Sequence, residues 1–388
     1  MSKKRYKIPK NYKRPYQRCT RCVMDTTDSK IVFDEDGVCD HCRNFDKNIK
    51  PFWNAHEENT DELMELAAKI RKAGEGKEYD CILGLSGGAD SSYLAYIAKE
   101  VMHIRPLIFV VDTGWNLNVA VENIEKIVKG LDLDMYTEVI NWKEMSDLQL
   151  SFFKAQISSQ DFPQDHAIFA GLYNYAVKHH IKYVLTGSNS ATEFIRPPVE
   201  WLYLNDLRMA KDIHKKYGKR PLTTFPTCGM LKYRILYRYF YGMKRVYPLD
   251  YVVYNKSEVE KMLHEKYGWM RYENKHYENV FTRFFEGYYL PHKFGFDTRK
   301  NVYSNQILAG TMKRDEALEL LKKPSYDPDL MEQDKEYIAK KLGISTEEFD
   351  EIIAGENKTP LDYKNSMWLL KIGVGICKLV GIENRNIR

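Results

Sequence analysis

The sequence contains no apolar run long enough to cross a membrane, and its first residues lack the apolar segment of a signal peptide. These absences predict a cytoplasmic protein without membrane insertion. Residues 1–18 contain no acid but carry eight lysines and arginines. We interpret this stretch as a solvated basic tail rather than a nucleic-acid arm, because the net charge of +5 over 388 residues is mild. We therefore expect no nucleic-acid partner.

Cysteines are few, and most of them are paired in the sequence. Four of the seven form two C-x-x-C motifs separated by 16 residues: Cys19, Cys22, Cys39 and Cys42. In a cytosolic chain this spacing is typical of metal binding rather than of disulfides. Four thiolates complete a tetrahedral Zn²⁺ shell, so we predict a structural zinc ribbon over residues 19–45, with an iron–sulfur cluster as the alternative.

A glycine-rich turn between a strand and a helix is the feature around which the chain is organised. Residues 79–92 read YDCILGLSGGADSS, in which a short apolar strand stops at Ser86 and a helix follows. Glycines let a backbone approach an oxyanion closely, and the first amides of a helix point at it. The turn fits neither G-x-x-x-x-G-K-[ST] nor G-x-G-x-x-G. We predict an anion site of a different type, made by Ser86, Gly87, Gly88, Asp90, Ser91 and Ser92.

The surrounding pattern predicts an α/β fold with a parallel sheet. A second strand is expected one crossover later, as a parallel βαβ unit requires. Predicted strands cover 105–112, 135–140 and 181–186, and predicted helices cover 118–130, 147–156, 167–180 and 206–217. The expected organisation is a tail (1–18), the ribbon (19–45), a linker and helix (46–78), the nucleotide domain (79–260) and a mostly helical substrate or partner region (261–388).

Strand ends supply further candidate ligands, because open parallel sheets bind ligands at the carboxyl ends of their strands. Asp112 ends the second strand, and Gly187, Asn189 and Glu193 lie in a polar turn after the strand at 181–186. We expect Asp112, Gly187 and Asn189 to contact the nucleotide. Asp90 and Glu193 are predicted Mg²⁺ ligands, since that ion prefers oxygen. For Glu193, a helix N-terminal role is the alternative.

Four other residues are candidates for chemistry. Lys256 follows a Pro-Leu turn and is predicted to reach phosphates as a point charge, the alternative being a surface lysine. Cys228 lies in a P-T-C-G turn, as a nucleophile or sulfur carrier, or as an inert buried thiol. His276 and Glu278 suit an acceptor pocket with acid–base capacity, although a structural polar network is equally compatible.

Longer motifs carry a resemblance to known families. The S-G-G-x-D-S turn resembles the pyrophosphate loop of the ATP pyrophosphatases, which cleave ATP between its α and β phosphates. Together with CTRCVMDTT, CDHC, TGSNSATE, PTCGMLKYR and KHYENVFTRFFEGYYLPHKFGFDTRK, it resembles the N-acetyl sugar amidotransferases of surface-polysaccharide and nonulosonic-acid biosynthesis. The resemblance implies an adenine-nucleotide α-hydrolase-like fold, ATP and Mg²⁺. The implied reaction converts an acetamido group of a nucleotide sugar into an acetamidino group, as in O-antigen, pseudaminic acid or legionaminic acid biosynthesis.

Ammonia for such a reaction needs a source. Residue 2 is Ser2, where N-terminal-nucleophile glutaminases expose a cysteine, and no Cys-His glutaminase pattern is visible. We therefore expect a separate glutaminase and an ammonia-channel subunit as partners. Two rival readings remain: a tRNA-modifying enzyme of the same fold that thiolates or amidates a base carbonyl, and a zinc-ribbon docking protein with a degenerate nucleotide site.

Overall fold

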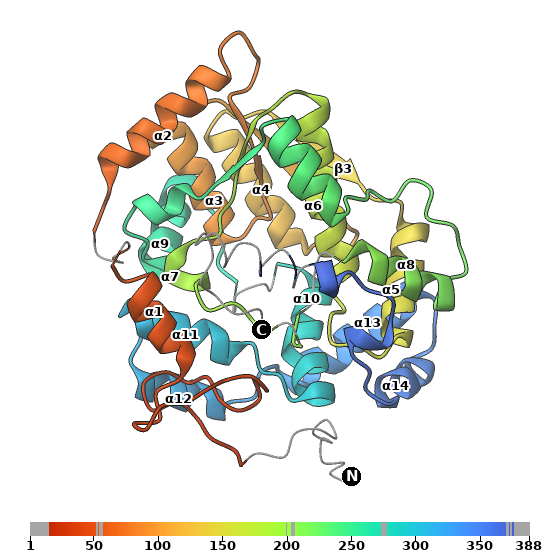
Figure 1. Ribbon diagram of the computed structural model, residues 1–388. Coiled ribbons are helices and arrows are strands. Elements are labelled where there is room, and N and C mark those ends of the chain that lie inside the picture. The colour runs from red at the N-terminus through yellow and green to blue at the C-terminus, as the bar shows by residue number, and fades with distance from the viewer. Residues whose placement is uncertain are drawn as a thin grey trace.

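A five-stranded parallel sheet organises the central part of the chain (Figure 1). The computed structural model describes residues 15–51, 53, 57–198, 200–202, 206–272, 278–369, 372 and 375. The strands are β1 (Cys81–Gly84), β2 (Pro106–Asp112), β3 (Met135–Val139), β4 (Tyr183–Leu185) and β5 (Lys244–Val246). Their order is β3-β2-β1-β4-β5, and all four neighbouring pairs are parallel. The predicted fold class is confirmed.

The strand order reverses beside β1. The chain runs outward from β1 to β2 and β3, and then returns to the other side of β1 as β4. The loops that leave β1 and β4 therefore diverge from neighbouring strands, which opens a crevice at their carboxyl ends. The two polar turns that the sequence singled out, at residues 86–90 and 187–193, both begin at this crevice.

Helices cover both faces of the sheet and make up most of the remaining chain. Around the sheet lie α3 (Ala89–Tyr96) with its π-helical continuation η1 (Ile97–Val101), α4 (Asn118–Gly130), α5 (Trp142–Lys154), α6 (Phe162–Lys178), α7 (Ser190–Glu193), α8 (Leu207–Tyr217), η2 (Lys232–Phe240), η3 (Pro248–Tyr251) and α9 (Lys256–Tyr267). None of the described helices is long and apolar enough to cross a membrane.

Strand β2 explains why the sheet needs two layers of helices. Its residues PLIFVV are all buried, as in a strand covered on both faces. Because side chains alternate along a strand, Phe109 packs with the α5 and α6 side, whereas Ile108 and Val110 pack with the α3, α4 and α9 side. Two apolar cores, one on each face, thus hold the sheet between its two layers of helices.

A third core joins segments that are far apart in the sequence. It contains the four paired cysteines together with aromatic residues of the C-terminal region, among them Phe281, Phe284 and Phe285. The segments concerned include α1 (Asp40–Asn48) and, towards the C-terminus, α10 (Val280–Phe284), η4 (Phe285–Phe294), α11 (Arg299–Ala309), α13 (Pro328–Leu342) and α14 (Thr346–Ala354). The C-terminal region also contains α12 (Arg314–Lys322) and η5 (Pro360–Asp362). Helix α2 (Thr60–Ala73) packs separately on the sheet domain.

Most predicted elements are found where the sequence placed them. Helix α4 has the predicted bounds of 118–130, and the C-terminal region is mostly helical as expected. Strand β5 was not predicted, because only three residues form it and two of them, Lys244 and Arg245, are exposed at the sheet edge. It nevertheless pairs with β4 and so supports the strand that carries the second polar turn.

Candidate functional site

The loop after β1 is shaped by hydroxyl contacts. The Ser86 amide donates to Ser91 Oγ at 3.2 Å, and the Gly88 amide donates to Ser86 Oγ at 3.3 Å. Ser91 Oγ in turn donates to the Gly88 carbonyl at 3.2 Å. Gly88 is the N-cap of α3, so the amides of the first helical turn lie next to these hydroxyls. The arrangement is a concentrated set of donors suited to an anion.

Gly87 needs to be glycine for two independent reasons. Its φ is +83°, in the left-handed region that L-residues rarely adopt. A Cβ at this position would lie 2.5 Å from the Ala120 carbonyl oxygen of α4. The turn is therefore pressed against α4, and its backbone has no room for a side chain.

A pocket of about 690 Å³, including its open mouth, lies in front of this loop. Eight of its lining residues were predicted from the sequence: Ser86, Gly88, Asp90, Ser91, Gly187, Glu193, Lys256 and Glu278. Ala89, Glu260, Trp269 and Tyr272 complete the lining. Residues from β1, β4, α9 and the C-terminal region thus meet at one crevice.

Acidic side chains outnumber cations in the pocket. Four carboxylates line it, from Asp90, Glu193, Glu260 and Glu278, whereas Lys256 is the one lysine in the lining. Lys256 Nζ lies 3.9 Å from Glu260 Oε1. Glu260 also pairs with Arg271, whose Nε lies 3.1 Å from Glu260 Oε2. A cation bound among these acids would favour an anionic ligand. Asp90 and Glu193 offer the hard oxygen ligands that Mg²⁺ prefers, so the residues present fit that ion.

Glu278 reaches the loop from the C-terminal region. Its Oε1 would lie 3.6 Å from a Cβ built on Gly88. The backbone holds it there, because the Leu117 amide donates to the Glu278 carbonyl at 3.0 Å and Asn116 forms an antiparallel bridge with Asn279. The loop after β2 thereby fixes the glutamate beside the anion site. His276 lies outside the described residues.

Buried groups behind the pocket support its two acidic ligands. The Tyr254 hydroxyl donates to Asp90 Oδ1, and burial together with that carboxylate raises the pKa of Tyr254. Asp250 accepts from the Ser190 amide at the start of α7, the short helix that ends at Glu193. Burial raises the pKa of Asp250, and the nearby Glu193 carboxylate adds to the effect. The phenol and the carboxyl thus fix the positions of the elements that present Asp90 and Glu193.

Several predicted residues lie outside the pocket lining. Ser92 is fully buried, and Asp112 Oδ1 accepts from the Gly114 amide at 2.8 Å. Asn189 is buried and donates to the Gly187 carbonyl at 3.3 Å, which shapes the second turn. Gly87 is not part of the pocket lining, and its carbonyl accepts a hydrogen bond from Trp269 Nε1 at 2.9 Å. Direct roles for these four residues therefore stay predictions.

Cys228 is buried at some distance in the sequence from any pocket residue. Burial raises the pKa of its thiol to about 11, which keeps it protonated near neutral pH. The Cys228 amide donates to Nε2 of His166, whose ring stacks on Phe162 with centroids 5.0 Å apart. Burial also lowers the pKa of His166 to about 4. A neutral thiol beside a neutral imidazole is typical of a core position.

Four pocket residues were not predicted as site residues: Ala89, which lies inside the predicted turn, and Glu260, Trp269 and Tyr272. Glu260 is one helical turn after Lys256, so i, i+4 spacing from a candidate lysine could have found it. Trp269 and Tyr272 follow α9, and only the fold brings them to the loop. Both are aromatic residues in an aromatic-rich chain, which gave them no distinguishing signal.

A second candidate site is the cysteine cluster. The Sγ atoms of Cys19, Cys22, Cys39 and Cys42 all lie within 4.8 Å of one another. The Sγ–Sγ distances are 3.8 Å for Cys19 and Cys42, 3.6 Å for Cys22 and Cys39, and 3.6 Å for Cys39 and Cys42. Four sulfurs at about 2.3 Å from one tetrahedral zinc would lie about 3.8 Å apart. In an iron–sulfur cube each thiolate binds a different iron and the sulfurs are more widely spaced, so the geometry fits a single ion.

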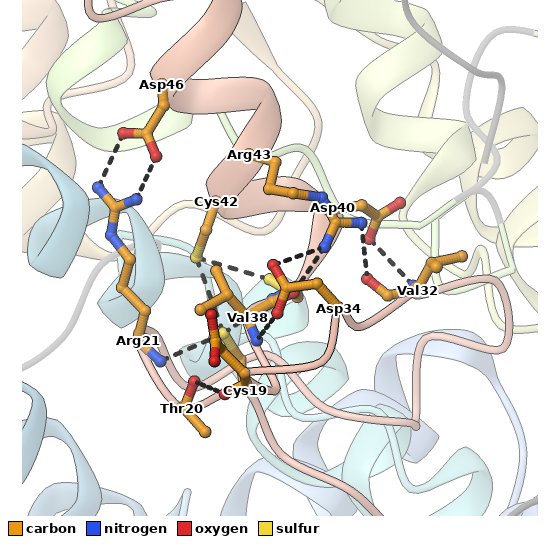
Figure 2. A network of polar contacts seen from close by, with 12 residues as sticks. Cys19, Thr20, Arg21, Val32, Asp34, Val38, Asp40, Cys42, Arg43 and Asp46 are labelled. Atoms are coloured by element: carbon orange, nitrogen blue, oxygen red, sulfur yellow. Dashed lines mark hydrogen bonds and ion pairs between the residues drawn. The ribbon is translucent and has the colours of Figure 1, made fainter.

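Polar contacts fix the two cysteine turns relative to each other (Figure 2). Arg21 donates to Asp46 of α1 at 3.0 Å, and Arg43 donates to the Val38 carbonyl at 2.8 Å. Three amides donate to Cys19 Sγ at distances of 3.2 to 3.4 Å, from Arg21, Cys22 and Cys39. Amide donors of this kind stabilise thiolates, as a metal site requires.

The cysteine-rich segment is docked on the C-terminal helices α11 and α12 (Figure 1). Arg314 of α12 donates to the Cys19 carbonyl at 2.8 Å and to the Cys22 carbonyl at 3.0 Å. Lys300 of α11 pairs with the buried Asp25 at 2.6 Å. The ribbon therefore shares its core with the region that supplies Glu278.

Comparison with known proteins gives one family match. Residues 278–374 match the model for the C-terminal domain of WbpG-like LPS biosynthesis proteins. The match begins at Glu278 and includes neither the loop nor the cysteines. An uncharacterized protein of Methanocaldococcus jannaschii is 26% identical over 174 residues, which cover 44% of this chain. The chain spans 58% of the length of that relative.

Three solved structures are weakly similar to parts of the chain. They are an NH3-dependent NAD synthetase from Campylobacter jejuni (17% identity, 73% of this chain and 94% of that one, TM-score 0.30), an NMN synthetase from Francisella tularensis (16%, 56% and 97%, 0.29), and the U34-tRNA thiolase NcsA from Methanococcus maripaludis with its [4Fe-4S] cluster (12%, 77% and 91%, 0.29). Scores this low carry no argument about function.

Proposed function

We propose that the protein is an ATP-dependent amidotransferase of surface-polysaccharide biosynthesis, which converts an acetamido group of a nucleotide sugar into an acetamidino group. One observation carries the proposal: Glu278, the first residue of the segment that matches LPS biosynthesis proteins, lies against the anion-binding loop in the same pocket. The loop suits a pyrophosphate, and the region that contributes Glu278 is matched to sugar biosynthesis. A nucleotide and a sugar acetamide would meet between them.

The reaction balances without a redox step. The acetamido oxygen attacks the α phosphorus of ATP, and the bond to the β phosphate breaks, which releases pyrophosphate. The product of this step is a cationic O-adenylyl imidate. Ammonia adds to its carbon, a proton is lost, and the C–O bond breaks to release AMP and the amidine. Adenylation is needed because an amide oxygen is otherwise a poor leaving group.

The pocket residues would act either on the phosphates of the nucleotide or in the addition of ammonia. Ser86, Gly88 and Ser91 would hold the pyrophosphate end through hydroxyl and amide donors. Lys256 would pair with a phosphate oxygen as a point charge. Asp90 and Glu193 would hold Mg²⁺, which neutralises phosphate charge when bound. Glu278 would accept the proton that ammonia loses as it adds.

Ammonia would come from a separate glutaminase and its channel subunit, as the sequence led us to expect. The zinc ribbon would be structural, because four cysteines leave no open coordination position. Thiolation of a tRNA base is less well supported, since no cysteine is part of the described pocket lining. The docking-protein reading would require a degenerate site, whereas the loop keeps its donors and its neighbouring acids.

The test uses the full chain with Mg·ATP, ammonium chloride and a panel of UDP- and CMP-linked acetamido sugars. We expect AMP and pyrophosphate in equal amounts, only with an acceptor, and a product in which one oxygen is replaced by NH. Ser86→Ala and Asp90→Ala should abolish both products. Release of ADP and phosphate, or AMP formation independent of sugar, would contradict the proposal. Co-purified tRNA without sugar-dependent turnover would favour the tRNA reading.

A further inference from the structure

The carbonyl of Gly87 is held by three side chains from outside the loop. Trp269 Nε1 donates to it at 2.9 Å, Tyr272 Oη at 3.2 Å and Asn123 Nδ2 at 3.5 Å. A carbonyl oxygen has two lone pairs, which Trp269 and Tyr272 can fill. The Asn123 contact is the weakest of the three, because the two Nδ2 hydrogens also serve the shorter bonds to Met270 and Tyr272. These contacts could not be predicted from the sequence, because Asn123 and the aromatic pair are more than a hundred residues apart.

The three donors are also connected to one another. Asn123 is fully buried on α4, and its side chain pairs with the backbone of Met270 in both directions, at 2.8 Å each. The same Asn123 amide donates to Tyr272 Oη at 3.1 Å. The segment 269–272 is therefore anchored to α4 and not merely adjacent to it. A donor attached to a rigid neighbour fixes its acceptor more firmly than a mobile one.

Fixing the Gly87 carbonyl also fixes the next amide. The peptide unit is planar and trans, so the Gly88 N–H points away from the Gly87 oxygen. That oxygen accepts from the buried side, while Gly88 lines the pocket and its amide lies 3.3 Å from Ser86 Oγ. The loop also packs closely against α4, because a Cβ on Gly87 would lie 2.5 Å from the Ala120 carbonyl oxygen.

We propose that Trp269, Tyr272 and Asn123 are positioning residues that orient the Gly87–Gly88 peptide toward the pyrophosphate end of the nucleotide. The inference rests on the proposed function, because it assigns pyrophosphate to this loop. The three residues hold the loop in its donor conformation before any ligand arrives, so binding does not have to order it. Their loss would weaken ligands that reach the loop and spare those that do not.

The experiment compares substitutions that each remove one hydrogen-bond donor, the indole N–H or the phenol hydroxyl, and leave an aromatic side chain. Trp269→Phe removes one donor and Tyr272→Phe removes another. The chain offers matched controls: Trp115 is equally buried and donates to Gln149 at 3.0 Å, and Tyr289 is buried and donates to the Ile157 carbonyl at 3.3 Å. Trp115→Phe and Tyr289→Phe therefore lose the same groups elsewhere in the core.

Calorimetric titration of each variant with Mg·ATP, magnesium pyrophosphate and AMP gives the readout. We expect Trp269→Phe and Tyr272→Phe to bind ATP and pyrophosphate about tenfold more weakly, the factor for one buried hydrogen bond, with AMP unchanged. The controls should match the wild type for all three ligands. A purely structural role would not separate pyrophosphate from AMP.

Each other outcome is decisive. Variants that match their controls, or that weaken AMP as much as pyrophosphate, would overturn the positioning role while leaving the proposed function intact. A wild-type chain that binds neither ATP nor pyrophosphate would overturn the proposed function and the inference with it. Should Trp269→Phe fail to fold, Tyr272→Phe decides alone, since its side chain is only partly buried.

Discussion

Replacing Gly87 with alanine tests the loop geometry most directly. The change puts a methyl group on a residue with φ of +83°, and an L-residue in that region costs about 1–2 kcal/mol. The new Cβ would also lie 2.5 Å from the Ala120 oxygen, whereas nonbonded carbon contacts are usually about 3.5 Å. Because the obstacle is backbone, no rotamer change relieves it, and the loop or α4 must move by roughly 1 Å.

Gly343 supplies the matched control for this substitution. Its φ is +75°, but a Cβ there would meet nothing within 4 Å. Gly343→Ala should therefore lose only the conformational cost, about 1–2 kcal/mol. Gly87→Ala should lower the free energy of unfolding by that amount and by about 1–3 kcal/mol more from overpacking. If the loop moves and relieves the overpacking, the variant should instead lose affinity for the ligand.

Two measurements decide between these costs. Thermal melting reports the stability of each variant, and calorimetry with Mg·ATP reports the loop. We expect Gly343→Ala to melt slightly lower and to bind ATP normally. Gly87→Ala should melt lower still or bind ATP at least tenfold more weakly. If the two alanine variants are indistinguishable in both assays, the contact between the loop and α4 is not the constraint we describe.

Three further predictions follow from the site and its surroundings. Lys256→Met should raise the KM for ATP by roughly tenfold, while Lys261→Met, on the same helix with an equivalent glutamate pair at 3.9 Å, should not change it; equal kinetics for both variants would remove Lys256 from the site. Metal analysis should find one zinc per chain and no iron, and Cys39→Ser should lose the zinc and lower the melting temperature; an iron–sulfur absorbance would refute the single-ion geometry. Burial lowers the pKa of His166 to about 4 in the folded protein, whereas a histidine in the unfolded chain has a pKa of about 6.5, so the unfolded chain becomes protonated at higher pH than the folded one. The free energy of unfolding should therefore fall by about 3 kcal/mol as pH drops from 6.5 to 4. His166→Phe should flatten that pH dependence in melting curves, and an unchanged slope would show that other groups cause it.

Local patterns predicted the sheet, because its central strands are short, buried and apolar runs between turn residues. The helix predicted at 118–130 has the observed bounds, and the strand predicted at 105–112 from its apolar run is observed as β2. Strand β5 could not be predicted, since its residues Lys244 and Arg245 have no apolar alternation and pair only because β4 is already in place. Edge strands of this kind depend on tertiary context.

The site was predictable where a motif carried the chemistry and not where distance in the sequence was large. The loop at 86–91 and the four cysteines could each be predicted from the spacing of their motifs. Trp269 and Tyr272 could not, because their role depends on a carbonyl 180 residues earlier in the chain. Asn189 was singled out from the polarity of its turn, where its side chain donates to the Gly187 carbonyl, and its contact with a nucleotide stays a prediction.

The acid surplus of the pocket is informative about the kind of reaction it suits. Four carboxylates and one lysine line the pocket, and Glu260 also pairs with Arg271. Under the proposed function, Mg²⁺ held by Asp90 and Glu193 would offset the repulsion between these acids and a triphosphate. Under the proposed reaction, a neutral acetamido group becomes a cationic imidate on adenylation, and the final amidine is also cationic near neutral pH. Carboxylates placed beforehand around the reacting carbon favour such charge development. Glu278 is the carboxylate contributed by the C-terminal region, so under the proposed function that region would take part in the chemistry as well as in the fold.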